Sequence, residues 1–236
     1  MMQPLSAAAM LAVWEDNWRR PPPWQGLALL DAACPDETRD SLLAMSVGRC
    51  HERLLLLHQW HFGASMTAVT TCTGCGELIE VTLDVAALRT QQTEAPPAWQ
   101  ELADASDVRF RVPALEDLIA AGDAATVDEA AQLLLQRCLE NPDVSLAPEA
   151  YAAVTAAMEH ADPLAVIELG GACPHCDQPW SAFLDVASFL WREVQNWAQR
   201  TLQEVHILAR AYGWREAEIL EMTAVRRQAY LQMVYG

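Results

Sequence analysis

Apolar positions in the N-terminal part of the chain recur at the spacing of α-helices, and prolines and glycines mark the helix ends. Four helices are expected there, over residues 5–20, 24–33, 37–45 and 49–62. The prolines at 21–23 end the first helix, Ser46 is placed to cap the last one, and Gly63 is placed to stop it. Residues 1–63 are therefore predicted to form a helical N-terminal region.

Two later segments have the composition of β-hairpins, and each carries a Cys-x-x-Cys pair at its turn. The first pair is Cys72 with Cys75, and the second is Cys173 with Cys176. The flanking residues are rich in Thr, Val and Ile or alternate in polarity, which favours strands. The expected strands are 66–71 with 77–83 and 166–169 with 180–184, within hairpin units 64–89 and 164–185.

The residues between and after the hairpins are mainly helical in pattern. Within the insertion, 90–163, we expect a polar linker over 90–107, a strand at 108–112, and helices over 113–121, 126–139 and 148–160. Thr126 and Glu129 have the spacing of a capping box for the second of these helices. The C-terminal region, 186–236, should begin with a long helix that Gly213 stops, followed by helices at 215–221 and 223–234.

The two cysteine units are related by more than their spacing. In each, the sequence Leu-Asp-Val-Ala begins eight residues after the second cysteine, at 83–86 and at 184–187. Each unit therefore reads strand, Cys-x-x-Cys, strand, LDVA, helix. Two such hairpins facing each other would place four thiolates around one tetrahedral site.

Zinc is the ion that this pattern predicts, one per chain, held by Cys72, Cys75, Cys173 and Cys176. Thiolates favour zinc, and four of them leave no open coordination position, which indicates a structural role. The fold class that follows is α+β and mainly helical: a split zinc ribbon with four cysteine ligands and a helical insertion, flanked by N- and C-terminal helices. A thioredoxin-like dithiol is the alternative, although the βαβ context of that motif is missing. A metal-free fold is a further alternative, and His175 is a less suitable ligand than the cysteines.

The remaining reactive residue types have structural interpretations. We expect Cys34, Cys50 and Cys138 in the core, and most of the nine tryptophans as well. His51 and His58 are seven residues apart on one helix face, close to His61, and are predicted to form a surface or interface stripe. His206 is expected to be structural. The sequence contains no common nucleotide-binding, hydrolase or metalloprotease motif, so a non-enzymatic protein is predicted.

Charge and hydropathy narrow the classes of partner. The formal net charge is −17, with 32 acidic and 15 basic residues, which disfavours nucleic acid and anionic membrane surfaces. Hydrophobic residues make up 52% of the chain, yet no apolar run reaches the roughly 18 residues of a membrane span. The N-terminus lacks the pattern of a signal peptide, so a cytoplasmic location is expected.

The C-terminal sequence VHILARAYGWREAEIL at 205–220, followed by RRQAYL at 226–231, resembles the tail of baseplate hub assembly chaperones of contractile-tailed phages. Proteins of extracellular contractile injection systems are similar, also in the segment 22–24, Cys34-Pro35, the Ser46 helix, Cys-x-x-Cys and LDVA. The resemblance covers most of the chain and is weakest over the predicted linker.

This resemblance implies a non-enzymatic chaperone or small component that helps to build a contractile tail, with baseplate or hub proteins as partners. The protein would then be cytoplasmic or part of a phage tail-like particle. The alternatives are a zinc-ribbon adapter of an unrelated pathway, or a thiol redox protein.

Overall fold

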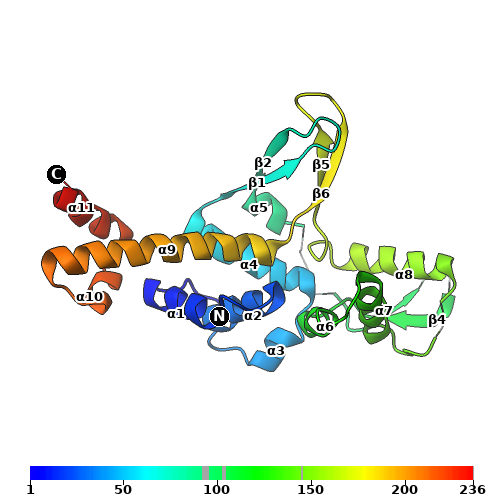
Figure 1. The fold of residues 1–236 in the computed structure, drawn as a ribbon. Helices are drawn as coiled ribbons and strands as arrows, with labels where there is room; N and C mark the ends of the chain where they lie inside the picture. The colour runs from blue at the N-terminus through cyan, green and yellow to red at the C-terminus, as the bar shows by residue number, and fades with distance from the viewer. Residues whose placement is uncertain (92–95, 103–104, 145, 236) are drawn as a thin grey trace.

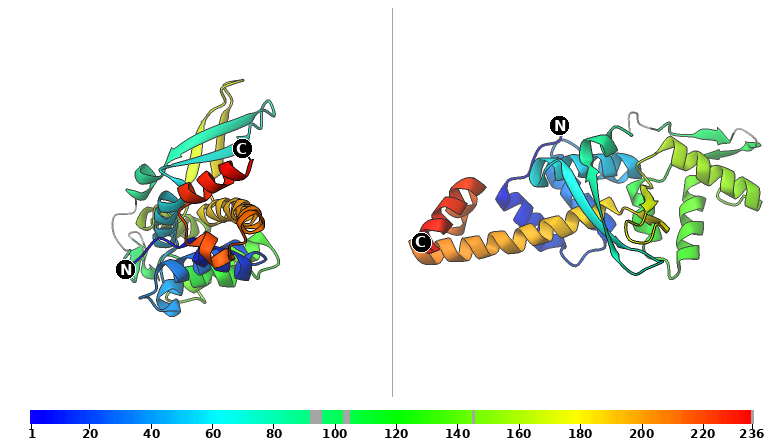
Figure 2. Two further views of the ribbon diagram at one scale, coloured as in Figure 1. Left: turned by 90° about the vertical axis from the view of Figure 1, so that its left-hand side faces the viewer. Right: turned by 90° about the horizontal axis from the view of Figure 1, so that it is seen from above.

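The computed structural model describes residues 1–91, 96–102, 105–144 and 146–235 and has a mixed α+β fold with small antiparallel hairpins. One long helix, α9 (Val186–Tyr212), forms the axis of the molecule (Figure 1). The N-terminal helices pack along it, the two cysteine hairpins project from one side, and the C-terminal helices lie at its far end (Figures 1 and 2). Within the described residues, none of the helices combines the length and apolar character needed to cross a membrane.

The N-terminal helices and α9 form the largest core. They are α1 (Ala7–Asn17), α2 (Pro22–Ala33), α3 (Arg39–Leu43) and α4 (Val47–Phe62). The Ser46 side chain accepts a hydrogen bond from the N–H of Arg49, which confirms the predicted cap. Helix α2 begins two residues before its predicted start, because proline at a first helical position loses no hydrogen bond. The core joins fully buried leucines of α2 and α4 to residues of α9: Leu27, Leu30, Leu55, Leu190 and Val194.

Each cysteine hairpin is a separate two-stranded antiparallel sheet. The strands are β1 (Ser65–Thr71) with β2 (Leu78–Asp84), and β5 (Glu168–Ala172) with β6 (Pro179–Phe183). The registers run from Ser65 opposite Asp84 and from Glu168 opposite Phe183. Both LDVA segments end a hairpin and start a helix, as predicted: α5 (Val85–Arg89) follows the first and α9 follows the second.

The insertion contains a strand pair of which the sequence pattern predicted only the second strand, at 108–112. Strands β3 (Gln100–Leu102) and β4 (Ala105–Phe110) lie in and beyond the predicted polar linker, and they pair antiparallel. Residues 92–95 and 103–104 of that linker lie outside the described residues. Strand β3 was missed because a three-residue strand has almost no periodicity, and Leu102 is buried in a cluster with residues that are distant in the sequence, such as Val154. Helices α6 (Leu115–Ala121), α7 (Val127–Cys138) and α8 (Pro148–Ala161) complete the insertion.

Two buried carboxylates form a region that we call the carboxylate junction: Asp162 ties the insertion to the start of α4, and Asp117 ties parts of the insertion to one another. Asp162 accepts hydrogen bonds from the hydroxyl of Ser46 (3.2 Å) and the N–H of Gly48 (2.8 Å). Asp117, whose side chain has no exposed surface, pairs with the guanidinium groups of Arg111 and Arg137. Asp162 is stabilised by the N-terminus of α4, and Asp117 is stabilised by two arginines. Both negative charges are therefore compensated, and both carboxylates can be buried.

The C-terminal helices α10 (Glu216–Leu220) and α11 (Ala224–Tyr235) fold back on the end of α9. Gly213 has a left-handed conformation (φ 70°) and stops α9, as predicted. The Trp214 ring stacks on Tyr212 with centroids 4.5 Å apart and meets Tyr230 edge-on at 4.8 Å. The segment that carries the family resemblance is therefore a packed unit with its own small core.

Candidate metal centre

The two Cys-x-x-Cys turns have the same backbone conformation. In each, the N–H of the first cysteine donates to the carbonyl five residues later, at 2.8 Å for Cys72 and 2.9 Å for Cys173. The residue after the second cysteine is left-handed, with φ 78° at Gly76 and 57° at Asp177. Its N–H donates back to the first cysteine's carbonyl at 2.9 Å in both turns. The sequence repeat is therefore a structural repeat, and each turn directs both of its sulfurs the same way.

The four sulfurs meet although the two pairs are far apart in the sequence. The Sγ atoms of Cys72 and Cys176 are 3.7 Å apart, and those of Cys75 and Cys173 are 3.8 Å apart. All four atoms lie within 4.8 Å of one another. A tetrahedral ion with metal–sulfur bonds of about 2.3 Å requires sulfurs about 3.8 Å apart. The Sγ–Sγ distances match that geometry and are far longer than the sulfur–sulfur distance of a disulfide bond, which is about 2.05 Å.

Packing between the hairpins holds the sulfurs in place. Cys72 and Cys173 are buried with Ile79 in a small cluster, while the other two cysteines are exposed. A Cβ atom at Gly74 would lie 3.1 Å from Cγ of Gln178, so the turns are in close contact there. One sulfur of each pair faces the hairpin core and one faces solvent.

Backbone hydrogen bonds and neighbouring thiols shift the pKa values of the cysteines in opposite directions. Those from the N–H groups of Cys75 and Gly74 lower the pKa of the Cys72 thiol to about 6. The N–H of Gln178 acts in the same direction on Cys176, but the neighbouring thiols and partial desolvation raise the pKa of Cys176 to about 12. Four thiols this close cannot all ionise without a cation between them. The electrostatics of the cluster therefore favour a bound positive ion.

The donor set defines what the cluster can do. Four sulfurs suit a soft or borderline cation in a closed tetrahedral site, with no position left for water or substrate. Among the described residues, the four cysteines are the group of metal-ligating side chains that converges in this way, and His175 is outside it. The cluster is compatible with one metal ion.

The histidines do not form the surface stripe that the sequence predicted. His58 is 2% exposed, and its ring packs against Phe62 and Phe189. Nδ1 of His51 lies 2.7 Å from the carbonyl oxygen of Leu164. Nε2 of His61 accepts the N–H of Leu5 at 3.1 Å. Burial lowers the pKa of all three imidazoles. The helix face they share is covered by distant parts of the chain, which a local pattern cannot reveal.

Two other groups of residues give a mixed outcome. Cys34, Cys50 and Cys138 are buried, as expected, and burial raises the pKa of Cys50 and of Cys138 to about 12. Most of the nine tryptophans contact a hydrophobic core, as predicted, although Trp191 is the one that is fully buried. Five more are partly buried and pack against a core cluster, as is common for a large side chain with a polar N–H: Trp14, Trp24, Trp180, Trp197 and Trp214. His206, expected to be structural, is exposed.

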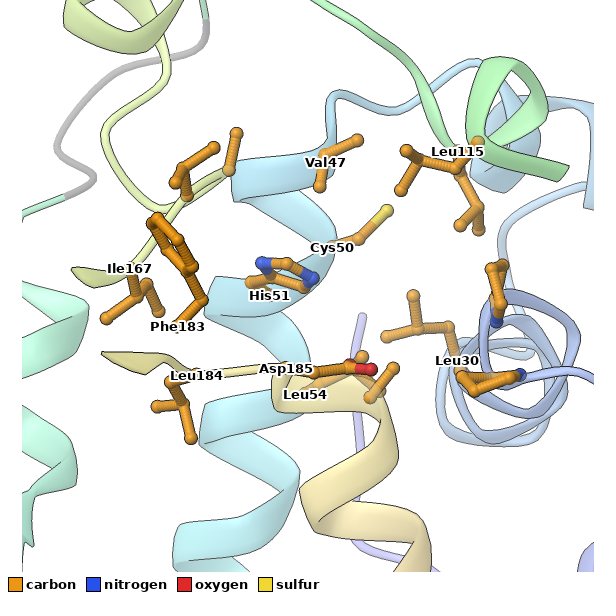
Figure 3. Close-up of a pocket in the computed structure, with 17 residues that line it drawn as sticks. Leu30, Val47, Cys50, His51, Leu54, Leu115, Ile167, Phe183, Leu184 and Asp185 are labelled. Atoms are coloured by element: carbon orange, nitrogen blue, oxygen red, sulfur yellow. The ribbon is translucent and has the colours of Figure 1, made fainter. Parts of the chain in front are cut away.

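Sequence reasoning missed an apolar cavity of about 420 Å³ at the base of the second hairpin (Figure 3). Its walls come from α2, α4, α6 and the junction of β6 with α9. The only local sign in the sequence was an apolar residue, Phe183, directly before LDVA. In the structure its side chain is 72% exposed at the cavity. The cavity exists only because elements from four regions of the chain meet.

Comparisons of this chain with known protein families, with curated proteins and with solved structures found no match.

Proposed function

We propose that the four cysteines bind one structural Zn²⁺ ion and that the two hairpins together form a split zinc ribbon. The observation that carries this proposal is the convergence of four sulfurs, from pairs 98 or more residues apart, at the spacing of a tetrahedral thiolate site. The closed donor set supports a fastening role, and the depressed pKa of Cys72 favours the thiolate that a metal needs.

Metal analysis of protein purified without chelator tests the zinc proposal. One zinc per chain is expected by mass spectrometry of the metal, with X-ray absorption reporting four sulfurs at about 2.3 Å. A chain purified without bound metal, under the same conditions, would overturn it. Iron in place of zinc would also overturn the assignment of the ion, while leaving the four ligands intact.

For the protein as a whole, we propose a non-enzymatic assembly chaperone or small structural component of a contractile tail or injection-system baseplate. Support comes from the C-terminal unit that carries the family resemblance, where Tyr212, Trp214 and Tyr230 form one aromatic cluster. Further support comes from the cysteine cluster, whose closed geometry suits fastening better than catalysis.

Deletion of the gene in a strain that makes the particles tests the baseplate role. Tails or sheaths without complete baseplates are expected in electron micrographs, with restoration by the wild-type gene. Mass spectrometry of finished particles then separates a retained component from a transient chaperone. Complete, functional particles from the deletion strain would contradict the proposal.

Thiol redox chemistry is the second candidate, and the lowered pKa of Cys72 next to the exposed Cys75 favours it. It predicts reversible disulfide formation in the purified protein at a defined potential. Zinc that stays bound across that potential range would exclude this role.

A further inference from the structure

The cavity at the base of the second hairpin, which we call the basal cavity, has the features of a docking site. Its volume of about 420 Å³ lies within the usual range for ligand and anchor pockets, and its lining is almost entirely apolar. Figure 3 shows His51 of α4 and Asp185 at the start of α9 among the apolar side chains around this space. Phe183 and Val166, at 72% and 49% exposed, also line it.

The described lining of the cavity carries a negative charge and no positive one at pH 7. Among the described residues that line the cavity, Asp185 and His51 are the ionisable side chains besides the thiol of Cys50, and no arginine is among them. Burial lowers the pKa of His51, so its imidazole is neutral at pH 7. Asp185 also accepts hydrogen bonds from Ser188, which hold its carboxylate in position. An occupant with apolar groups and a positive charge fits this lining.

Helix α11 of the same chain presents such a surface. Val225, Ala229 and Met233 lie four residues apart and are all exposed, with Val225 82% and Met233 70% accessible. We call these three residues the outer face of α11. Residues 224–235 include two arginines and no acidic residue, in a chain of net charge −17. Arg227 turns inward to Glu204, and Arg226 stays exposed beside the outer face.

The outer face of α11 is too far away to fill the cavity of its own chain. The cavity includes Ala187 in the first turn of α9, whereas α11 packs on the opposite end of that helix (Figure 1). Helix α9 has 27 residues, which at 1.5 Å per residue makes it about 40 Å long. A contact between the two surfaces therefore requires two molecules.

We propose that the outer face of α11 in one copy docks into the basal cavity of a second copy, as an amphipathic helix docks into a groove. Val225 and Met233 supply apolar anchors, and Arg226 faces the carboxylate of Asp185. The two surfaces differ, so the contact is head to tail and leaves one free surface at each end of a dimer. Further copies add until a ring closes or a filament grows. This inference goes beyond the function proposed above and does not depend on it.

Two matched variants test the proposal. Phe183→Lys places a positive charge at the cavity, where it repels Arg226 of the incoming helix, and Met233→Asp places a negative charge on the outer face; both side chains are highly exposed, so the fold should tolerate each change. Val127→Asp, at an 85% exposed position of α7 away from both surfaces, is the control. Sedimentation velocity over a dilution series should show concentration-dependent oligomers for the wild type and the control. Each of the other two variants alone should be monomeric.

Mixing the two interface variants gives the decisive result. The Phe183→Lys chain keeps its helix face and the Met233→Asp chain keeps its cavity, so an equimolar mixture should form a one-to-one dimer and nothing larger. Monomers in that mixture would overturn the head-to-tail contact, as would a wild-type protein that stays monomeric at every concentration. Oligomers of either variant alone that match the wild type would also overturn it.

Discussion

The hairpin tips and the carboxylate junction join distant parts of the chain by different chemistry. At the tips, four sulfurs from two turns meet at a partly exposed point, with Cys75 and Cys176 open to solvent. At the junction, Asp117 and Asp162 are fully buried and satisfied by arginines, a hydroxyl and a backbone N–H. With the zinc ion that we propose, the tips depend on a partner that can be removed, whereas the junction is complete within the chain.

Because of this difference, a chelator and acid should destabilise different parts of the molecule. Removal of a metal acts on the tips and leaves the junction intact. Protonation acts on both, but thiolates take up protons at higher pH than a carboxylate between two arginines.

Substitution of one buried ligand, Cys173→Ser, should remove the proposed zinc ion and with it the fastening of both hairpins. The free energy of unfolding should fall on the order of 4 kcal/mol when free zinc exceeds its dissociation constant about 1,000-fold. Urea unfolding with and without chelator measures this: chelator should destabilise the wild type and leave the variant unchanged.

The exposed residue Thr73, within the first Cys-x-x-Cys turn, provides the control for this experiment. Thr73→Ala should keep one zinc per chain and the stability of the wild type. A wild-type unfolding curve that does not respond to chelator would contradict the role of the ion.

Substitution of the junction carboxylate, Asp117→Asn, should lower the free energy of unfolding by about 2 kcal/mol, because the buried side chain loses the charge that strengthens its hydrogen bonds with the partly exposed Arg111 and Arg137. Chelator should not change this loss. Urea unfolding at pH 7 measures it, with Asp123→Asn at an exposed position as the control. An equal loss in the two variants would show that the junction charge is unimportant.

The same carboxylate sets a pH dependence. Burial raises the pKa of Asp117, but hydrogen bonds from Arg111, the Ala114 N–H and Arg137 outweigh it and hold the pKa below the usual 3.8. The pair therefore stabilises the fold fully above pH 3.8, and this stabilisation is lost as the pH falls through the lower folded-state value. The difference in stability between wild type and Asp117→Asn should shrink in that window.

The two LDVA aspartates cap helices of very different length. Asp84 accepts N–H groups of α5, and Asp185 accepts that of Ser188 in α9. Alanine at either position should cost about 1 kcal/mol. Hydrogen exchange should show a local loss of protection in α5 for Asp84→Ala and a global one for Asp185→Ala, since α9 crosses the main core. A loss of protection confined to the first turn of α9 in Asp185→Ala would contradict the conclusion that α9 supports the main core.

The left-handed residues of the two turns should respond in opposite directions. Gly76→Ala places a side chain at φ 78°, which should cost about 1 kcal/mol, although no atom lies within 4 Å to clash with it. Asp177→Gly relaxes the same conformation and should leave stability unchanged or raise it by up to about 1 kcal/mol. Urea midpoints of the zinc-loaded proteins measure both, and shifts of the same sign would contradict the shared turn geometry.

Local signals were enough to predict much of the fold and the cysteine cluster. The caps at Ser46 and Thr126 and the stop at Gly213 follow from side chains within a few residues of the helix end, and the sequence predicted all three. The capping box at Thr126 is slightly shifted, because Glu129 accepts the N–H of Ala125 rather than that of the cap residue. The convergence of the sulfurs could be predicted because the repeat after each pair revealed two equivalent units.

Features made by distant contacts could not be predicted in this way. Leu102 becomes part of a core only through Phe110 and Val154, and His58 is buried by Phe189 of α9. The same holds for the basal cavity, which needs four regions of the chain to exist. A periodicity search reads neighbours along the chain, and these features depend on neighbours in space.

The separation of the two turns also has a consequence for the order of synthesis. The first hairpin leaves the ribosome about 98 residues before the second, which is roughly 5–20 seconds at ordinary translation rates. For that interval the nascent chain carries only two of the four cysteines that the proposed metal site requires. The cluster can therefore form only after the whole intervening segment and residue 176 have been synthesised.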